Sequence, residues 1–186
     1  MPKPPPAIPI VRNLIEYAAI AGWWGAMLGL HTSGAVSPSV MAVLVVVGCW
    51  MKTVFFGTEN MRQLFDAART NMPHHRFLML MGVNTSQMIL AFALDFHLLH
   101  RIDAASFTGI VSTAGHAELL FNYFYLSTLN FSFFGYSDIL PQTVAAKIVN
   151  LSEIVLAFVT VIVMLSDFIS LKESLRGRRS DHPNNT

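Results

Sequence analysis

The chain has 186 residues, of which 53% are hydrophobic and only 12% are charged. Soluble domains carry about 25% charged residues, so this composition argues against a soluble domain and indicates a membrane protein. The net charge of +1 provides no basic surface for nucleic acid, and the single cysteine, Cys49, excludes an intrachain disulfide.

Four apolar segments follow a proline-rich start at residues 1–9, and each is long enough to cross a hydrocarbon core about 30 Å thick. They are expected at residues 11–30, 39–56, 77–98 and 143–171. The first is interpreted as a retained span, because no small-residue cleavage site follows a short apolar core. We therefore predict an all-α membrane protein that crosses the lipid bilayer with four transmembrane helices.

Several polar or amphipathic side chains interrupt these segments. Lys52 stands near the end of the second segment and is expected to extend its ammonium group to the membrane surface. Residues 84–87 read Asn-Thr-Ser-Gln within the third segment, and we expect them to face other helices or their own backbone, because such groups are costly in lipid. Trp23 and Trp24 lie past the middle of the first segment and are expected to face packed protein.

Residues 58–76 form a polar connector between the second and third segments. Charged residues recur there at helical spacing, which predicts an amphipathic surface helix that ends before Pro73. The inward face of that helix is expected to carry Met61, Leu64, Phe65 and Ala68.

A loop at residues 99–115 is expected to lead into a short helix at residues 116–130. This helix runs into a stretch at residues 127–141 that is too polar and too aromatic for an ordinary loop. The stretch reads S-T-L-N-F-S-F-F-G-Y-S-D-I-L-P and lies between two long apolar segments.

This stretch resembles the pore loop of tetrameric potassium channels, whose filter reads T-T-V-G-Y-G-D-x-x-P. Gly135, Tyr136, Asp138 and Pro141 match the pattern without gaps. Further matches to bacterial pore helices and to inner pore helices lie on both sides, at Tyr125, Ser127, Thr143, Lys147, Ile148 and Val149. The resemblance covers roughly residues 77–171.

The resemblance implies that residues 77–171 are a pore module made of an outer helix, a pore helix, a filter and an inner helix. An N-terminal tail and two peripheral transmembrane helices would precede it at residues 1–57, joined by the connector at residues 58–76. A basic cytoplasmic tail would follow at residues 172–186. One pore loop per chain implies a homotetramer around a central pore.

Basic residues predict the orientation, because they are enriched on the cytoplasmic side of membrane proteins. In a chain that crosses four times, all of the following fall on one side: Lys3, Arg12, Lys52, Arg62, Arg69, Arg76 and the tail residues Lys172, Arg176, Arg178 and Arg179. The protein then lies in the cell's inner (plasma) membrane, with both termini in the cytoplasm. The filter faces outward, as the resemblance requires.

The filter is assigned to Ser132, Phe133, Phe134, Gly135, Tyr136 and Ser137. In the family, rings of backbone carbonyls replace the water shell of the ion. Phe133 and Phe134 stand here for the family's last Thr and its Val, and Ser137 stands for its second Gly, where a left-handed backbone would cost about 1–2 kcal/mol. Phe133 either narrows the pore as a hydrophobic constriction or rotates away to pack against the inner helix, and Phe134 is expected to fill space behind the filter.

Filter support is assigned to Tyr125, Ser127, Asn130, Asp138 and Glu153. By analogy with the family, Asp138 either pairs behind the filter with Tyr125 or is a solvated charge at the rim. Glu153 lies in the middle of the fourth segment. It either braces the pore helix, with a hydrogen bond from Ser127 or Asn130, or lines a cavity as a cation site.

We expect a passive channel subunit for monovalent cations that is not an enzyme and needs no cofactor. It is either selective for K⁺, as the resemblance implies, or weakly selective, so that Na⁺ passes as well. Asp167, near the inner end of the fourth segment, either attracts cations to the cytoplasmic mouth or lies solvated at the helix end. One alternative is a non-conducting, pore-like regulatory or interaction subunit. Another is a four-span membrane metal protein or enzyme that uses His97 and His100, which are three residues apart and share a helix face.

Overall fold

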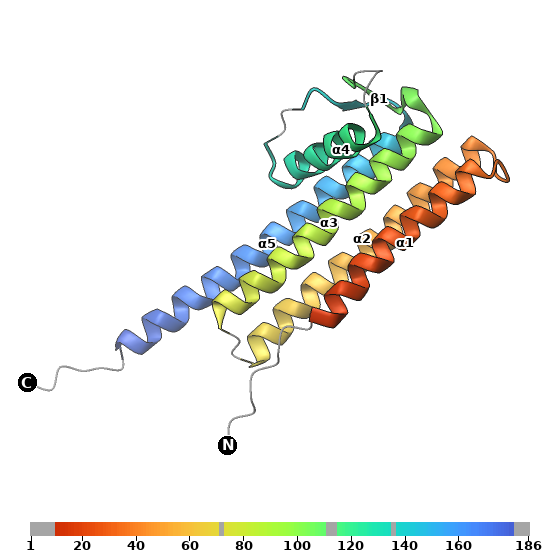
Figure 1. The fold of residues 1–186 in the computed structure, drawn as a ribbon. Helices are drawn as coiled ribbons and strands as arrows, with labels where there is room; N and C mark the ends of the chain where they lie inside the picture. The colour runs from red at the N-terminus through yellow and green to blue at the C-terminus, as the bar shows by residue number, and fades with distance from the viewer. Residues whose placement is uncertain (1–9, 71–72, 111–114, 135–136, 181–186) are drawn as a thin grey trace, which may run out of the picture.

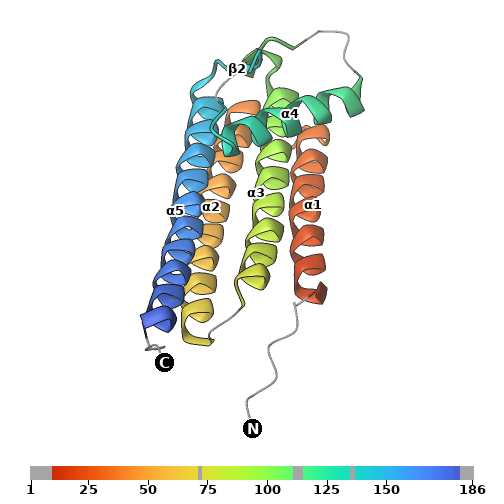
Figure 2. The same cartoon turned by 90° about the vertical axis from the view of Figure 1, so that its left-hand side faces the viewer.

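The computed structural model of the chain describes residues 10–70, 73–110, 115–134 and 137–180. Four long helices lie side by side, and a shorter helix crosses them near one end (Figure 1 and Figure 2). In chain order the elements are α1 (Ile10–Thr32), α2 (Pro38–Thr70), α3 (His74–Ile102), the 3₁₀ turn η1 (Ala104–Ser106), β1 (Phe107–Thr108), α4 (His116–Phe131), β2 (Leu140–Pro141) and α5 (Val144–Ser180). The described part of the chain is therefore helical apart from two short strands and the connecting turns.

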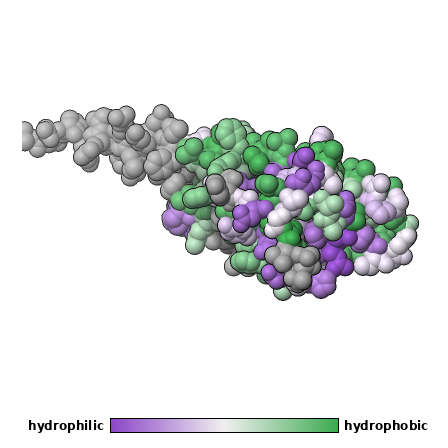
Figure 3. All heavy atoms as spheres, turned by 90° about the horizontal axis from the view of Figure 1, so that it is seen from above, coloured by the Kyte–Doolittle hydropathy of each residue, from purple (hydrophilic) through white to green (hydrophobic). Residues whose placement is uncertain are grey.

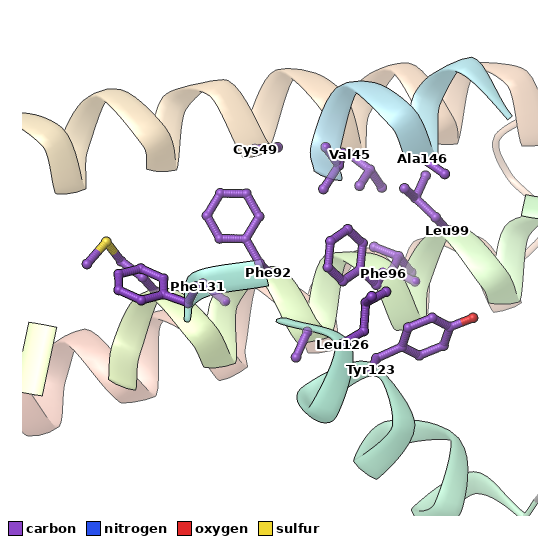
Figure 4. Packing of buried hydrophobic residues seen from close by; sticks show 14 of the residues in the cluster. Val45, Cys49, Phe92, Phe96, Leu99, Tyr123, Leu126, Phe131 and Ala146 are labelled. Carbon is purple, nitrogen blue, oxygen red and sulfur yellow. The ribbon is translucent and has the colours of Figure 1, made fainter. Parts of the chain in front are cut away.

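Helix α3 is the centre of the bundle, because it contacts each of the other four helices. Helix α1 packs mainly against α3, and α2 packs against both α3 and α5. The sequence predicted α1 and α2 as a pair peripheral to the pore module, and this stays a prediction; within one chain, α2 is part of the packed bundle. Its apolar residues Val45 and Cys49 belong to the same buried cluster as Phe92 of α3 and Ala146 of α5, which fixes α2 in the core (Figure 4).

Three of the described helices contain stretches long and apolar enough to cross a membrane. These stretches are Pro38–Asp66 in α2, His75–Ile102 in α3 and Val144–Ser166 in α5. Helix α1 has the predicted position and length but is not among the three. Arg12, Asn13 and Glu16 interrupt its first two turns with polar and charged side chains.

The predicted surface helix in the connector is instead the continuation of α2, which runs without a break to Thr70. No proline interrupts α2 after its first residue, so nothing stops it at the end of the apolar segment. Its predicted inward face is also wrong in part, since Met61 and Phe65 are exposed. Leu64 does pack inward, against Phe77 of α3 and its neighbours.

The described part of the predicted loop at residues 99–115 contains regular structure. Helix α3 continues through Ile102, and β1 then pairs antiparallel with β2, with Phe107 opposite Pro141. Gly109 follows β1 with a φ of +86°, and a Cβ there would lie only 1.8 Å from the carbonyl oxygen of Asp138. The chain after α3 is thus fastened to the chain that follows the predicted filter.

Figure 4 shows how aromatic and aliphatic side chains from α2, α3, α4 and α5 meet in one buried cluster. Phe92 and Phe96 of α3 lie at its centre, and Tyr123 and Leu126 enter it from α4. Seen from above in Figure 3, polar and hydrophobic side chains mix on the end of the molecule, with hydrophobic ones gathered along one margin. The core therefore holds α4 against two of the helices that can cross a membrane.

Candidate functional site

Helix α4 presents two different faces. Leu119, Tyr123 and Leu126 recur every three or four residues, and they are buried against α3 and α5. Phe121, Phe124 and Tyr125 lie on the other side and are exposed. The helix spans His116–Phe131, close to the range expected from the sequence, and it begins without a side-chain cap.

The end of α4 is closed by a Schellman motif. The amide of Phe133 donates to the carbonyl of Asn130 at 3.3 Å, and the amide of Phe134 donates to that of Leu129 at 3.2 Å. This motif needs a left-handed residue after the helix, a position usually held by Gly, and Phe133 takes it with a φ of +57°. A left-handed backbone at Ser137 would follow only if it took the place of the family's second Gly; among the described residues, Phe133 is the only non-glycine residue with a positive φ.

The two phenylalanines of the predicted filter turn outward. The Phe133 ring lies edge-on to that of Phe158 on α5, with centroids 6.5 Å apart, yet 46% of Phe133 stays exposed. Phe134 is 77% exposed within one chain, and its place behind the filter stays a prediction. The Schellman turn directs both residues away from the buried face of α4. Gly135 and Tyr136 lie outside the described residues.

Glu153 is held behind α4 by the two residues that the sequence suggested. Asn130 Nδ2 donates to Glu153 Oε2 at 2.7 Å and to Asn150 Oδ1 at 2.8 Å, and the Ser127 hydroxyl is hydrogen-bonded to the other Glu153 oxygen. The Glu153 side chain is only 1% exposed, so in a single chain it faces α4 rather than an open cavity. This geometry favours the bracing role over the cation site.

The single proton of the Ser127 hydroxyl limits which hydrogen bonds around Glu153 can form together. The Ser127 hydroxyl has one proton but lies within hydrogen-bond distance of two acceptors, Glu153 and the carbonyl of Ile89 at 2.9 Å. If Ser127 donates to Ile89, the bond to Glu153 requires a proton on the carboxyl group. A neutral Glu153 therefore satisfies every partner, and it avoids placing an unpaired charge in the core.

The other predicted filter supports do not meet. Tyr125 is exposed on α4 and Asp138 is exposed after the filter, and among the described residues no hydrogen bond joins them. Asp138 is held instead through its backbone, which lies against Gly109. Ser137 accepts a hydrogen bond from the amide of Ile139 at 3.1 Å. Asp167 lies on α5, but its side chain is outside the part of the chain that the structure describes.

Lys52 of α2 forms an ion pair with Asp95 of α3. Its ammonium nitrogen lies 2.5 Å from both carboxylate oxygens of Asp95 on α3, and both side chains are largely buried. Lys52 stands in the middle of the apolar stretch Pro38–Asp66, too far from either end to reach water easily. The sequence could have indicated this pair, because Lys52 is the only charged residue of the second apolar segment and Asp95 is the only one of the third.

Two further polar groups link the long helices. Asn60 of α2 donates to Thr160 of α5 at 2.7 Å and accepts from Asn84 of α3. Gln87 of α3 donates to Glu16 of α1 at 3.0 Å. The expectation that the polar residues of the third segment face other helices is therefore confirmed for Asn84 and Gln87.

Arg12 of α1 reaches another helix, with its guanidinium 3.0 Å from Glu59 of α2. Its neighbour Glu16 lies 3.4 Å away along α1. The polar residues at the start of α1 are thus paired within the bundle.

Among the residues that the structure describes, no group of three or more His, Cys, Asp or Glu is arranged to hold a metal ion. Comparisons with protein-family models, with curated proteins and with solved structures found no match.

Proposed function

We propose that the chain is a subunit of a homotetrameric channel for monovalent cations, related to the potassium channel superfamily. The observation that carries the proposal is the position of the G-Y-x-D-x-x-P motif. It follows directly after α4, a short helix packed between two helices of membrane-crossing length. In this reading α3 is the outer helix, α4 the pore helix and α5 the inner helix.

The arrangement of α4 supports cation binding at the motif. The C-terminal end of a helix carries a partial negative charge, which favours a cation nearby. Helix α4 ends at Phe131, four residues before Gly135. Glu153, Asn130 and Ser127 fasten this end of α4 to α5, so the carbonyl groups that follow would start from a fixed position.

Exposed apolar surface supports the tetramer. Large apolar side chains on α4 and on the long face of α5 are 44–66% exposed within one chain; they are Phe121, Phe124, Tyr125, Leu151, Val155, Phe158, Ile162 and Leu165. Patches of this extent mark contacts with protein or lipid. One loop per chain supplies one carbonyl per layer, and a ring of four needs four chains.

We also propose that α1 crosses the membrane, which gives four spans and cytoplasmic termini in the plasma membrane. Its polar residues are no obstacle, because Arg12 is paired with Glu59 and Glu16 accepts a hydrogen bond from Gln87. Pairing of this kind lowers the cost of polar groups within the bilayer. Val11, Leu14 and Ile15 are exposed on the same helix and suit contact with lipid. These positions support insertion of α1 beside α3.

The test is the reversal potential of the purified tetramer in a planar bilayer, with K⁺ on one side and Na⁺ on the other. A reversal near the potassium equilibrium value supports a K⁺-selective pore despite Phe133, Phe134 and Ser137. A reversal near zero supports a weakly selective cation pore. The matched control is Gly135→Ala, which should lose current because a methyl group opposes the left-handed backbone that an inward-pointing carbonyl needs.

Silence from confirmed tetramers would overturn the conducting role and favour a non-conducting, pore-like subunit. Replacing Phe133 with Thr separates a closed entrance from a lost function. If Phe133 is a hydrophobic constriction, the Thr variant should pass more current than the parent protein.

A further inference from the structure

A groove lies between α2 and α5, toward the ends of these helices that are far from α4 (Figure 1). Helices α2 and α5 pack against each other along the bundle (Figure 2). The groove has a volume of about 790 Å³, and its wall on α2 carries residues at helical spacing, which therefore share one face. They include Met61, Arg62, Phe65, Asp66 and Arg69, and Val159 of α5 lines the opposite wall.

The groove is open because a glycine stands where α2 faces α5. A Cβ on Gly57 would lie 3.9 Å from Leu156 Cδ1, an ordinary contact, so the space beside it is not filled by either helix. Met61 and Phe65 continue the same wall and are exposed within one chain. Exposed apolar side chains that line a hollow mark a contact with lipid or with another protein.

The groove crosses the level at which the apolar part of α2 ends. The stretch of α2 that can cross a membrane ends at Asp66, whereas Gly57 lies well within it and Arg69 lies beyond it. From Gly57 to Arg69 the groove extends about 18 Å along the helix axis. In a bilayer its inner part therefore lies beside acyl chains, and its outer part lies at the level of the headgroups.

The charge of the lining favours an anion. Arg62 and Arg69 supply two positive charges and Asp66 supplies one negative charge, so the lining carries a net charge of +1. Arg62 Nε lies 4.0 Å from Asp66 Oδ2, and 71% of the Arg62 side chain is exposed. A guanidinium has five N–H donors, so this contact leaves it able to bind the oxygens of a phosphate.

We propose that the groove binds one anionic phospholipid from the surrounding leaflet. Arg62 and Arg69 hold its phosphate, and an acyl chain lies along Gly57, Met61 and Phe65. A phospholipid carries a negative phosphate directly above an apolar chain, which is the order of the lining. A soluble protein could not reach Gly57, since that part of the groove lies below the membrane surface.

The predicted orientation agrees with this occupant. Basic residues place this end of the bundle at the cytoplasmic leaflet, where anionic lipids are concentrated. Lipid binding here requires α2 and α5 to be inserted in the membrane, and it is independent of conduction. A silent protein would therefore leave the lipid site intact.

The test is native mass spectrometry of the detergent-purified full chain with added dioleoyl phosphatidylglycerol or dioleoyl phosphatidylcholine. We expect one site per chain that binds phosphatidylglycerol about fivefold more tightly, because each basic charge near a headgroup contributes a factor of about five. Arg69→Gln should abolish this preference, and Asp66→Asn should raise it to about 25-fold. Val159→Phe should weaken both lipids alike, because its ring fills the space of the acyl chain.

The matched control is Arg101→Gln, which removes an exposed arginine at the other end of the bundle and should keep the fivefold preference. Equal binding of the two lipids by the parent chain overturns the proposal, and so does a preference that survives replacement of both Arg62 and Arg69. Displacement of the lipid by glycerol phosphate alone would show a plain phosphate site and overturns it too. Lipid binding by monomers but not by tetramers would assign the groove to a second copy of the chain.

Discussion

Replacing Glu153 tests the brace behind α4 most directly. In the structure, its carboxyl group accepts from Asn130 and is bonded to Ser127, while Ser127 also lies 2.9 Å from the carbonyl of Ile89. If the Ser127 hydroxyl donates to the carbonyl of Ile89, a protonated Glu153 is the donor to Ser127. A glutamine has the same shape, one carbonyl oxygen for Asn130 and one N–H for Ser127, so Glu153→Gln should keep every bond.

Glu153→Ala should cost far more. It empties a site that is 1% exposed, and large-to-small changes in a core cost about 2–5 kcal/mol. One N–H of Asn130 also loses its acceptor, although the other keeps Asn150 at 2.8 Å. We expect a total loss of about 3–5 kcal/mol for Ala and less than about 1 kcal/mol for Gln.

Thermal unfolding of the detergent-purified protein measures the difference. For chains of this size, 1 kcal/mol shifts the midpoint by about 2–4 °C, so the Ala variant should unfold roughly 4–20 °C earlier than the Gln variant. Glu118→Ala, which removes an exposed carboxylate from the first turn of α4, is the control and should change little. Equal losses for Gln and Ala would refute the reasoning, since an ionised Glu153 would then be what holds the network.

Two further changes test other parts of the fold. Phe133→Gly and Phe133→Ala both remove the ring contact with Phe158, but only Gly adopts the left-handed backbone without strain. The Gly variant should therefore be more stable than the Ala variant by about 1 kcal/mol in the same assay. Equal unfolding midpoints for the two variants would contradict the Schellman turn. Asp95→Leu leaves the Lys52 ammonium group buried and alone, and should cost about 3–5 kcal/mol. The double variant Lys52→Met/Asp95→Leu should recover most of that loss, whereas additive losses in a double-mutant cycle would show that the two charges do not act as a pair.

The positions of the helices followed from local features of the sequence. Long apolar segments predicted α2, α3 and α5, and the short helix expected at residues 116–130 is observed as α4 over His116–Phe131. Such segments are readable because each helix satisfies its own backbone, so its position depends mainly on residues near in sequence. The bond between Asn130 and Glu153 was also foreseen, since both residues belong to the stretch that resembles a pore module.

The ends of the helices and the partners of the polar side chains were harder to predict from the sequence. The polar residues after Phe56 suggested a new surface helix, but a helix ends where its backbone is interrupted, and α2 runs on to Thr70. The left-handed position would be expected at Ser137 only if that residue took the place of the family's second Gly. It lies at Phe133 because the closing turn of α4 needs it there, and the hydrogen bonds of that turn are set by where the helix stops.

By itself, the sequence determined that this is an all-α membrane-type chain with a pore-loop-like motif after a short helix. The tertiary structure decided which polar residues meet, because a buried charge or amide takes a partner from whichever helix packs against it. Lys52 therefore pairs with Asp95, and the ring of Tyr123 lies beside those of His97 and His100. Those contacts join residues 23 to 43 positions apart, and no local pattern of spacing records them.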